Sequence, residues 1–209
     1  MLRVLLAGIA LFALSGCALI PPAPEYVAPP APREFRAMWV ATVANIDWPS
    51  KPGLPVAVLR EEMQRILTTA RQLKLNAVIL QVRPAADAIY PSQFEPWSEY
   101  LSGRQGVAPG DGCDPLAEWV KAAHASGIEL HAWFNPYRAR HASAKSPLAA
   151  QHVANTHPQI VKTYGDMLWM DPGEEQAAAR TLAVIADVVR RYDVDGVHID
   201  DYFYPYPIK

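Results

Sequence analysis

The sequence predicts an α/β fold of the (β/α)8 barrel type, of which this chain covers about the first four β/α units. Short apolar segments typical of strands alternate with amphipathic segments typical of helices, and this alternation predicts a parallel sheet. In the second, third and fourth predicted strands, polar residues become more frequent toward the carboxyl end, and the long loops all follow strands. A barrel with its site at the carboxyl ends of its strands has both features. An open doubly wound sheet is the alternative fold.

The first predicted unit is a strand at 36–42 followed by a helix at 56–73. The loop between them contains three prolines, a residue type that interrupts regular structure. Apolar residues recur in the helix at the spacing of one buried face: Leu59, Met63, Ile66, Leu67, Ala70 and Leu73. A second strand is predicted at 76–83, and a long loop follows it as far as Cys113.

The second predicted helix begins with Asp114 as its N-cap residue and Pro115 at its first position, and it ends at Gly127. We expect it to bury Leu116, Trp119, Val120 and Ala123. The third predicted strand, 128–135, alternates an apolar row with a row that contains His131, Trp133 and Asn135.

A connection that is far longer than the usual loop runs from this strand to Met170, and we expect it to be functional. The third predicted helix begins with Asp171 as N-cap residue, has Pro172 in its first turn and Glu174 at the capping-box position. Its predicted buried stripe is Leu182, Ile185, Val188, Val189 and Tyr192.

The fourth predicted strand ends in a pair of carboxylates followed by aromatic residues and prolines. Because side chains alternate along a strand, Gly196, His198 and Asp200 share one face, and Val197 and Ile199 share the other. In a barrel the apolar row would face the helices and the polar row would face inward. Asp200, the last inward residue, is therefore predicted to lie where such barrels perform chemistry.

The N-terminal segment is typical of a bacterial lipoprotein. Arg3 precedes an apolar stretch at 4–14 that is too short to span a bilayer, and Leu14-Ser15-Gly16-Cys17 resembles a lipobox. We expect residues 1–16 to be a signal peptide, and Cys17 to be lipidated and to anchor the protein to a membrane. The stretch up to Pro32 is rich in proline and alanine and is predicted to be an extended tether. A plain secretory signal that contains Cys17 is the alternative.

The composition is that of a globular protein and argues against nucleic-acid binding. The net charge is −2 and no run of Lys or Arg occurs, whereas nucleic-acid binders carry a basic footprint. With Cys17 lipidated, Cys113 is the one cysteine left, and we expect it to be an unreactive loop thiol.

Asp200 and Asp201 are the predicted catalytic residues. Asp200 would act as general acid or as nucleophile in a glycosidase. Two adjacent carboxylates on a strand point to opposite sides, so a cooperating second carboxylate must come from elsewhere. A later strand is the first choice, and Asp47, Asp87 and Glu129 are weaker candidates. The alternative is that Asp200 and Asp201 only cap a loop.

Six aromatic residues lie mostly in loops after strands or at strand ends, where rings could cover the apolar faces of sugars. They are Trp48, Trp97, Trp133, Tyr137, Tyr202 and Tyr204. Arg83, Asn135 and Arg138 would supply polar contacts, with structural salt bridges as the alternative. His131 and His198 share the face of Asp200 and could contact it or a sugar hydroxyl, or be interior histidines.

A metal bound by these two histidines and Asp200 is a further alternative. No zinc-protease spacing of histidines occurs, so we predict no metal and no cofactor.

Several blocks together resemble the glycosyl-hydrolase-like 10 family of bacterial envelope proteins. They are Asp195-Gly196-Val197-His198-Ile199-Asp200-Asp201-Tyr202 with Tyr204-Pro205, Arg36 with Trp39, Asn76, Gln81-Val82-Arg83-Pro84 with Asp87 and Tyr90, His131-Ala132-Trp133, Asn135-Pro136-Tyr137-Arg138, and Asp171-Pro172-Gly173. The resemblance implies a (β/α)8 glycoside hydrolase, and it places Asp87 among the substrate-binding candidates. Members of the family include an outer-membrane lipoprotein that cleaves peptide-free glycan strands of peptidoglycan.

We therefore expect an envelope glycoside hydrolase, held at the outer membrane by its lipid and facing the periplasm, that cleaves peptidoglycan glycan strands. The stretch 33–209 is shorter than the roughly 250 residues of a complete barrel, and the family's barrel continues past Lys209. We expect the second carboxylate in that continuation, and the chain alone to be inactive without it. A non-catalytic glycan-binding lipoprotein and a metal-dependent hydrolase are the rival functions.

Overall fold

The computed structural model describes residues 34–110 and 112–207. The predicted signal peptide, Cys17 and the predicted tether lie outside these residues. All the elements below belong to the unit Phe35–Lys209. None of the helices that the structure describes is long and apolar enough to cross a membrane.

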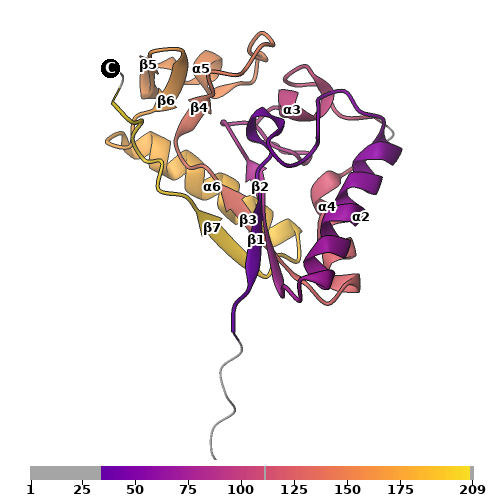
Figure 1. Cartoon of the computed structure of the whole chain (residues 1–209). Coiled ribbons are helices and arrows are strands. Elements are labelled where there is room, and N and C mark those ends of the chain that lie inside the picture. The colour runs from indigo at the N-terminus through magenta and orange to yellow at the C-terminus, as the bar shows by residue number, and fades with distance from the viewer. Residues whose placement is uncertain (1–33, 111, 208–209) are drawn as a thin grey trace, which may run out of the picture. The chain divides into compact units, whose positions relative to one another are not determined.

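A four-stranded parallel sheet organises this unit, which confirms the predicted α/β class (Figure 1). Its strands are β1 (Ala37–Val40), β2 (Ala77–Arg83), β3 (Glu129–Phe134) and β7 (Gly196–Ile199). They lie side by side in chain order and all pairs are parallel. A doubly wound sheet reverses its strand order at a switch point, and no reversal occurs among these four strands.

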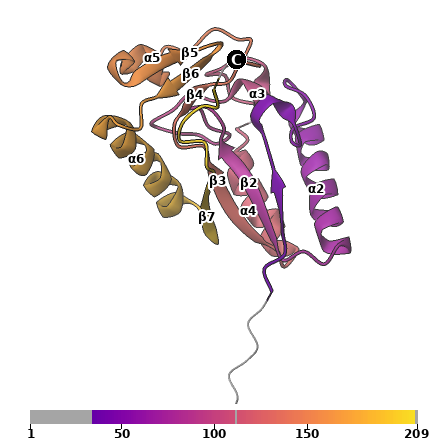
Figure 2. The ribbon, with the colours of Figure 1, turned by 60° about the vertical axis from the view of Figure 1, so that its left-hand side comes forward.

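Three helices pack on one face of the sheet, as Figures 1 and 2 show from two sides. They are α2 (Val56–Gln72), α4 (Pro115–Ala125) and α6 (Glu175–Arg191). The main core lies between them and the sheet, and it includes Leu67, Leu80, Trp119, Leu130, Phe134 and Val188. The apolar row predicted for the third strand is fully buried, because it faces these helices.

Helix α4 starts as predicted. The Asp114 carboxylate accepts a hydrogen bond from the Ala117 N–H at 3.2 Å, and Pro115 occupies the first helical turn, where its missing N–H costs nothing. Leu116, Trp119, Val120 and Ala123 are all buried. Gly127 follows the helix with a φ of 69°, a left-handed conformation that favours glycine.

Helix α6 corrects two predictions. It begins at Glu175, with Glu174 at the N-cap position, because the Asp171 carboxylate serves the preceding turn by accepting from the Gly173 N–H at 2.9 Å. Leu182 and Val189 are exposed rather than buried. The face that packs on the core is instead centred on Ala177, Thr181, Val184 and Val188.

The long connection predicted after the third strand folds into a small antiparallel sheet. Its strands are β4 (Arg138–Arg140), β5 (Val161–Tyr164) and β6 (Met167–Met170), with β6 in the centre. It encloses a second core that includes Ala139, Ile160 and Met170. Figures 1 and 2 show this sheet at the carboxyl ends of the parallel strands.

Short helical turns complete the loops. They are η1 (Val43–Asn45) after β1, α3 (Glu99–Ser102) after β2, and α5 (Val153–Thr156) with η2 (Pro158–Ile160) before β5. Val197 and Ile199, which we predicted to face helices, are exposed at the β7 edge of the described sheet.

Candidate active site

Asp200 lies directly after β7 and receives hydrogen bonds from two residues at the end of β3. The indole Nε1 of Trp133 donates to Oδ2 at 3.0 Å, and the amide Nδ2 of Asn135 lies 3.2 and 3.1 Å from the two carboxylate oxygens. Parallel pairing of Trp133 with His198 brings these strand ends together. Strand alternation therefore places Asp200, Trp133 and Asn135 on one inner edge, as predicted.

The side chain of Asn135 is held from both ends. Its Oδ1 accepts the backbone N–H of Arg138 at 2.8 Å, so its Nδ2 is the end that faces Asp200. The Asn135 backbone N–H donates to the Arg83 carbonyl at 3.0 Å. Because Asn135 is fully buried, the position of its amide group is fixed by the fold.

Arg138 is a nearly buried cation beside this carboxylate. It is 7% exposed, and its guanidinium lies 5.2 Å from the ring centre of Tyr202 and 5.7 Å from that of Trp169. Burial lowers the pKa of Arg138, and the charge of Asp200 opposes that shift. Its Nε has no hydrogen-bond partner among the described residues. Because this Nε atom is itself buried, Arg138 acts on the site through its charge and through its stacking with Tyr202 and Trp169.

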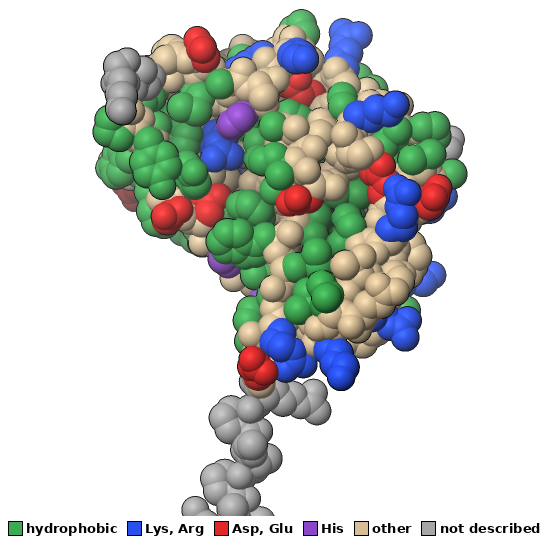
Figure 3. Space-filling view, viewed as in Figure 1, with side chains coloured by type: hydrophobic (Ala, Val, Ile, Leu, Met, Phe, Trp, Pro, Cys, Tyr) green, Lys and Arg blue, Asp and Glu red, His purple; other side chains and the backbone are tan. Residues whose placement is uncertain are grey.

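Aromatic rings form a wall on the inner face of the sheet. Trp39, which is 60% exposed, lies 5.7 Å from Trp133 and 5.4 Å from His198, measured between ring centres. Figure 3 shows apolar side chains gathered on this face with carboxylates among them. Such a surface combines apolar rings with polar groups, which is what sugar binding requires.

Gly196 allows this wall to form. A Cβ atom at this position would lie 2.3 Å from Nδ1 of His131, the residue paired with it on β3. His131 in turn contacts Phe35, and its Nε2 donates to the Glu129 carboxylate at 3.0 Å. Glycine is thus the residue that lets the His131 ring lie against β7.

The segment after Asp200 docks on the antiparallel sheet. Asp201 is exposed, and the Trp169 indole donates to the Phe203 carbonyl at 2.9 Å. Tyr137 packs against Phe203, with 6.0 Å between ring centres. Tyr204 is exposed and lines a hollow of about 170 Å³ over β5 and β6. The antiparallel sheet therefore positions the aromatic residues that follow the carboxylates.

Trp48 is not available to a ligand, contrary to our prediction. Its indole is buried, packs edge-to-face on Trp119 at 5.4 Å and donates to the Leu59 carbonyl at 3.1 Å. The loop that carries it folds back onto α2, so this aromatic residue belongs to the core.

Arg83 is likewise structural. It forms a fully buried ion pair with Glu95, in which Nε donates to Oε2 at 2.7 Å, and its Nη1 donates to the Asn135 and Pro136 carbonyls at 2.7 and 3.0 Å. The alternative of a structural salt bridge is therefore what the structure shows. With both oxygens of Glu95 engaged, this guanidinium has no free face for a substrate.

Asp87 is buried as well and does not reach a ligand surface. It accepts from the Ala85 N–H at 3.1 Å and from Gln105 Nε2 at 3.4 Å. Burial raises the pKa of Asp87 to about 7, against the hydrogen bond from Ser98.

The site predicted from the sequence left out three residues of this region, although Trp39 was noted among the family blocks. Trp39 stands on the inner row of β1 and could have been found by extending the alternation to the first strand. Trp169 was hidden in a connection that we took for a loop. Glu95, the partner of Arg83, lies in an irregular segment where no spacing rule points to it.

The described residues contain no group of three or more His, Cys, Asp or Glu side chains placed to hold a metal ion. Cys113 is buried, and its Sγ donates to Glu118 at 3.5 Å. Burial raises the pKa of the Cys113 thiol to about 11, which keeps the thiol protonated at neutral pH; its bystander role stays a prediction.

Comparisons with known proteins identify the family of this chain. Residues 34–209 match the family model described as glycosyl hydrolase-like 10. The chain is similar to glycosyl hydrolase YngK of Bacillus subtilis, with 48% identity over 177 residues, which are 84% of this chain and 34% of YngK. It is also similar to glycosyl hydrolase DigH of Escherichia coli, with 36% identity over 186 residues, which are 81% of this chain and 42% of DigH. The chain thus spans less than half the length of these curated relatives.

A solved structure shares the fold. A noncanonic maltogenic α-amylase, AmyB from Thermotoga neapolitana, aligns with a TM-score of 0.50 and 13% identity over 81% of this chain and 40% of that enzyme. At this identity the likeness concerns the fold alone.

Proposed function

Because the chain belongs to the glycosyl hydrolase-like 10 family, we propose that it forms the first part of a (β/α)8 barrel that hydrolyses glycosidic bonds. The parallel sheet in chain order, with helices on one face, supports such a barrel. The substrate in this proposal is the glycan strand of peptidoglycan, stripped of its peptides.

The observation that carries the proposal is the geometry around Asp200. A carboxylate at the carboxyl end of a parallel strand is held by Trp133 and Asn135, and the exposed ring of Trp39 packs against Trp133. In this arrangement the reactive group is fixed before the substrate arrives, which lowers the entropic part of the barrier. Asp200 then acts as general acid or as nucleophile.

A glycosidase needs a second carboxylate about 5–9.5 Å from the first, across the sugar. Asp201 is exposed and follows Asp200 directly, so it does not take that role in this proposal. We place the second carboxylate in the part of the whole protein that corresponds to the additional length of the relatives. The activity accordingly belongs to the whole protein.

The predicted lipid anchor supports the choice of substrate. A protein attached through Cys17 to the outer membrane and facing the periplasm meets peptidoglycan as its abundant polysaccharide. No cofactor takes part in the proposed reaction, since carboxylates alone perform it in most glycosidases.

The test uses the full-length protein with Asp200→Asn and, as matched control, Asp201→Asn. Each is incubated with peptide-free glycan strands and with intact sacculi, and products are identified by mass spectrometry. We expect wild type and Asp201→Asn to shorten the peptide-free strands, and Asp200→Asn to be slower by about a thousandfold or more. Strands that wild type binds but leaves uncut would replace the proposal with a non-catalytic glycan-binding lipoprotein. Cleavage abolished by a chelator would replace it with a metal-dependent hydrolase.

A further inference from the structure

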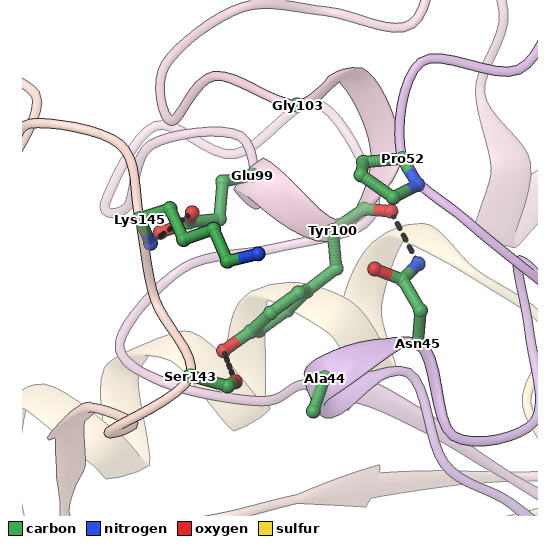
Figure 4. Close-up of a pocket in the computed structure, with 8 residues that line it drawn as sticks. All are labelled: Ala44, Asn45, Pro52, Glu99, Tyr100, Gly103, Ser143 and Lys145. Carbon is green, nitrogen blue, oxygen red and sulfur yellow. Dashed lines mark hydrogen bonds between the residues drawn. The ribbon is translucent and has the colours of Figure 1, made fainter.

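A second pocket, of about 230 Å³ and lined by both apolar and polar residues, lies among the loops at the carboxyl ends of the strands (Figure 4). Its walls come from η1 after β1, from α3 after β2, and from the loop after β4. Pockets that enclose a whole small-molecule ligand measure roughly 300–1,000 Å³. The size of this pocket suits one polar substituent of a larger ligand.

Lys145 gives the pocket an unpaired positive charge. Its side chain reaches across the pocket between Glu99 and Tyr100 (Figure 4), and its ammonium forms no ion pair or hydrogen bond within the described residues. The nearby Glu99 carboxylate is engaged elsewhere, because its Oε2 accepts the backbone N–H groups of Lys145 and Ser146 at 2.8 and 2.9 Å. Lys145 is exposed to solvent, and its ammonium, at a concave site and without a protein partner in the described part of the chain, is suited to an incoming anion.

Hydroxyl groups lie on the same wall as potential donors. The Tyr100 hydroxyl and the Ser143 hydroxyl are 3.1 Å apart, and Ser143 Oγ is also 2.8 Å from Nδ1 of His141. Burial raises the pKa of Tyr100 to about 12, so the phenol stays neutral and can donate. Because Nδ1 of His141 accepts the backbone N–H of Ser143, the Ser143 hydroxyl also donates to it, and the Tyr100 hydroxyl is the one that can turn from Ser143 to a ligand. The ammonium and this one hydroxyl together match the two oxygens of a carboxylate.

The pocket is rigid on its other side. The Asn45 side-chain amide donates to the carbonyls of Pro49 and Tyr100 at 2.9 and 2.8 Å. Ala44 and Asn45 both have a φ of 55°, an unfavourable conformation for residues other than glycine. Strained backbone held by such bonds is common at binding sites.

This pocket and Asp200 lie at the same end of the sheet. Asp200 follows β7 directly, and the pocket is formed by segments that follow β1, β2 and β4. A glycan strand that lies along this end would pass both Asp200 and Lys145.

We propose that this pocket binds the carboxylate of an acidic sugar in the glycan strand, with Lys145 as the cation that recognises it. The inference rests on the proposed function, because it takes the ligand to be a glycan that passes Asp200. Peptide-free peptidoglycan fits this chemistry, since removal of the peptide leaves a free carboxylate on every second sugar. A glycan of neutral sugars lacks the recognised group.

The test measures binding and cleavage separately, in the full-length protein. The probes are peptide-free glycan strands and the same strands after chemical reduction of their carboxylates to alcohols. Affinities are measured by calorimetry in the Asp200→Asn background, alone and combined with Lys145→Met or, as matched control, Lys121→Met on the outer surface of α4. Cleavage is measured with Asp200 intact.

Untreated strands should bind about tenfold more tightly than reduced strands, the difference expected of one charge-assisted hydrogen bond. Lys145→Met should abolish that difference, and Lys121→Met should leave it unchanged. Equal affinity for both strands, or a preference that survives Lys145→Met, would overturn the inference even if wild type cleaves glycan. If the strands bind through Lys145 in a carboxylate-dependent way but are not cleaved, the inferred role of the pocket would be supported and the proposed hydrolase activity would be refuted.

Discussion

Two charged clusters at the ends of neighbouring strands differ in how completely the protein satisfies them. The Arg83–Glu95 pair at the end of β2 is fully buried, and carbonyl groups of Asn135 and Pro136 accept the remaining hydrogen bonds of the guanidinium. The Asp200 cluster at the ends of β3 and β7 is only partly buried. Its neighbouring cation, Arg138, keeps an unused donor.

This difference separates structure from function among residues of the same chemical types. A satisfied buried pair holds loops together and offers nothing to a ligand. The carboxylate of Asp200 is only partly buried, so a substrate can still reach it. Asn135 belongs to both clusters, because its carbonyl accepts from Arg83 and its side chain donates to Asp200. Four predictions test the distinction.

The largest effect on stability should come from neutralising the buried pair. Glu95→Gln leaves the Arg83 guanidinium buried without its hydrogen-bonded anion, and we expect the free energy of unfolding to fall by about 3–5 kcal/mol. Glu118→Gln is the matched control, because Glu118 forms a two-bond pair with Arg60 on the surface, and its loss should cost under about 1 kcal/mol. Chemical denaturation measures both. Equal losses would remove the distinction between buried and exposed pairs.

The next effect is a pH dependence that arises from Asp87, whose charge acts on both Arg83 and Arg138. Burial raises the pKa of Asp87 from 3.8 to about 7, so the folded state binds its proton more tightly than the unfolded state. Its contribution to stability is complete below pH 3.8 and is lost as the pH rises through 7. The loss should be at most about 4 kcal/mol.

Unfolding free energies of wild type and Asp87→Asn, measured from pH 4 to 8, test this effect. The difference between the two proteins should change in the stated direction, with Asp87→Asn gaining relative stability as the pH rises. Asp195 serves as a control, because its contribution to stability should change with pH in the opposite direction. Partial burial tends to raise its pKa, but hydrogen bonds from His124 and Leu130 hold the pKa of Asp195 below its ordinary value. If the unfolding free energies of wild type and Asp87→Asn change in parallel with pH, Asp87 is not the source of the pH dependence.

A smaller effect should follow from separating β7 from β3. Gly196→Ala places a Cβ atom against the His131 ring, and we expect a loss of about 2 kcal/mol in stability together with reduced glycan cleavage. His131→Ala should relieve the clash, so the double variant should be more stable than the sum of the single effects predicts. Additive losses would show that the ring does not determine the strand spacing.

The smallest effect concerns one hydrogen bond of the Asp200 cluster. Trp133→Phe keeps an aromatic ring but removes the N–H that donates to Asp200. We expect kcat for glycan cleavage to fall about tenfold, which corresponds to about 1.4 kcal/mol, with KM nearly constant. Thermal unfolding should show under about 1 kcal/mol of change. A change in KM alone would assign Trp133 to substrate binding.

Much of the fold could be predicted because the local signals were strong. Strand alternation predicted β2 and β3, and Asp114 with Pro115 marked the start of α4. The antiparallel sheet was missed because β4, β5 and β6 have only three or four residues each, too few to show a period.

The candidate site was predictable where it lies on strands and unpredictable where it lies in loops. The position of Asp200 follows from alternation on β7, whereas the roles of Trp48 and Arg83 depend on residues far along the chain. Trp48 is buried by Trp119, and Arg83 is paired with Glu95 across an irregular loop. A loop aromatic or arginine has the same local sequence whether it faces the core or a ligand. Tertiary contacts decide between the two.

The two N–H groups that meet Asp200 also give the site its own spectroscopic reporters. An indole N–H and a carboxamide NH2 produce signals in proton–nitrogen spectra that stand apart from those of the backbone. The side-chain N–H groups of Trp133 and Asn135 both donate to the carboxylate of Asp200. A sugar that arrives at Asp200 would shift both signals together, so occupancy of the site could be followed without a label on the glycan.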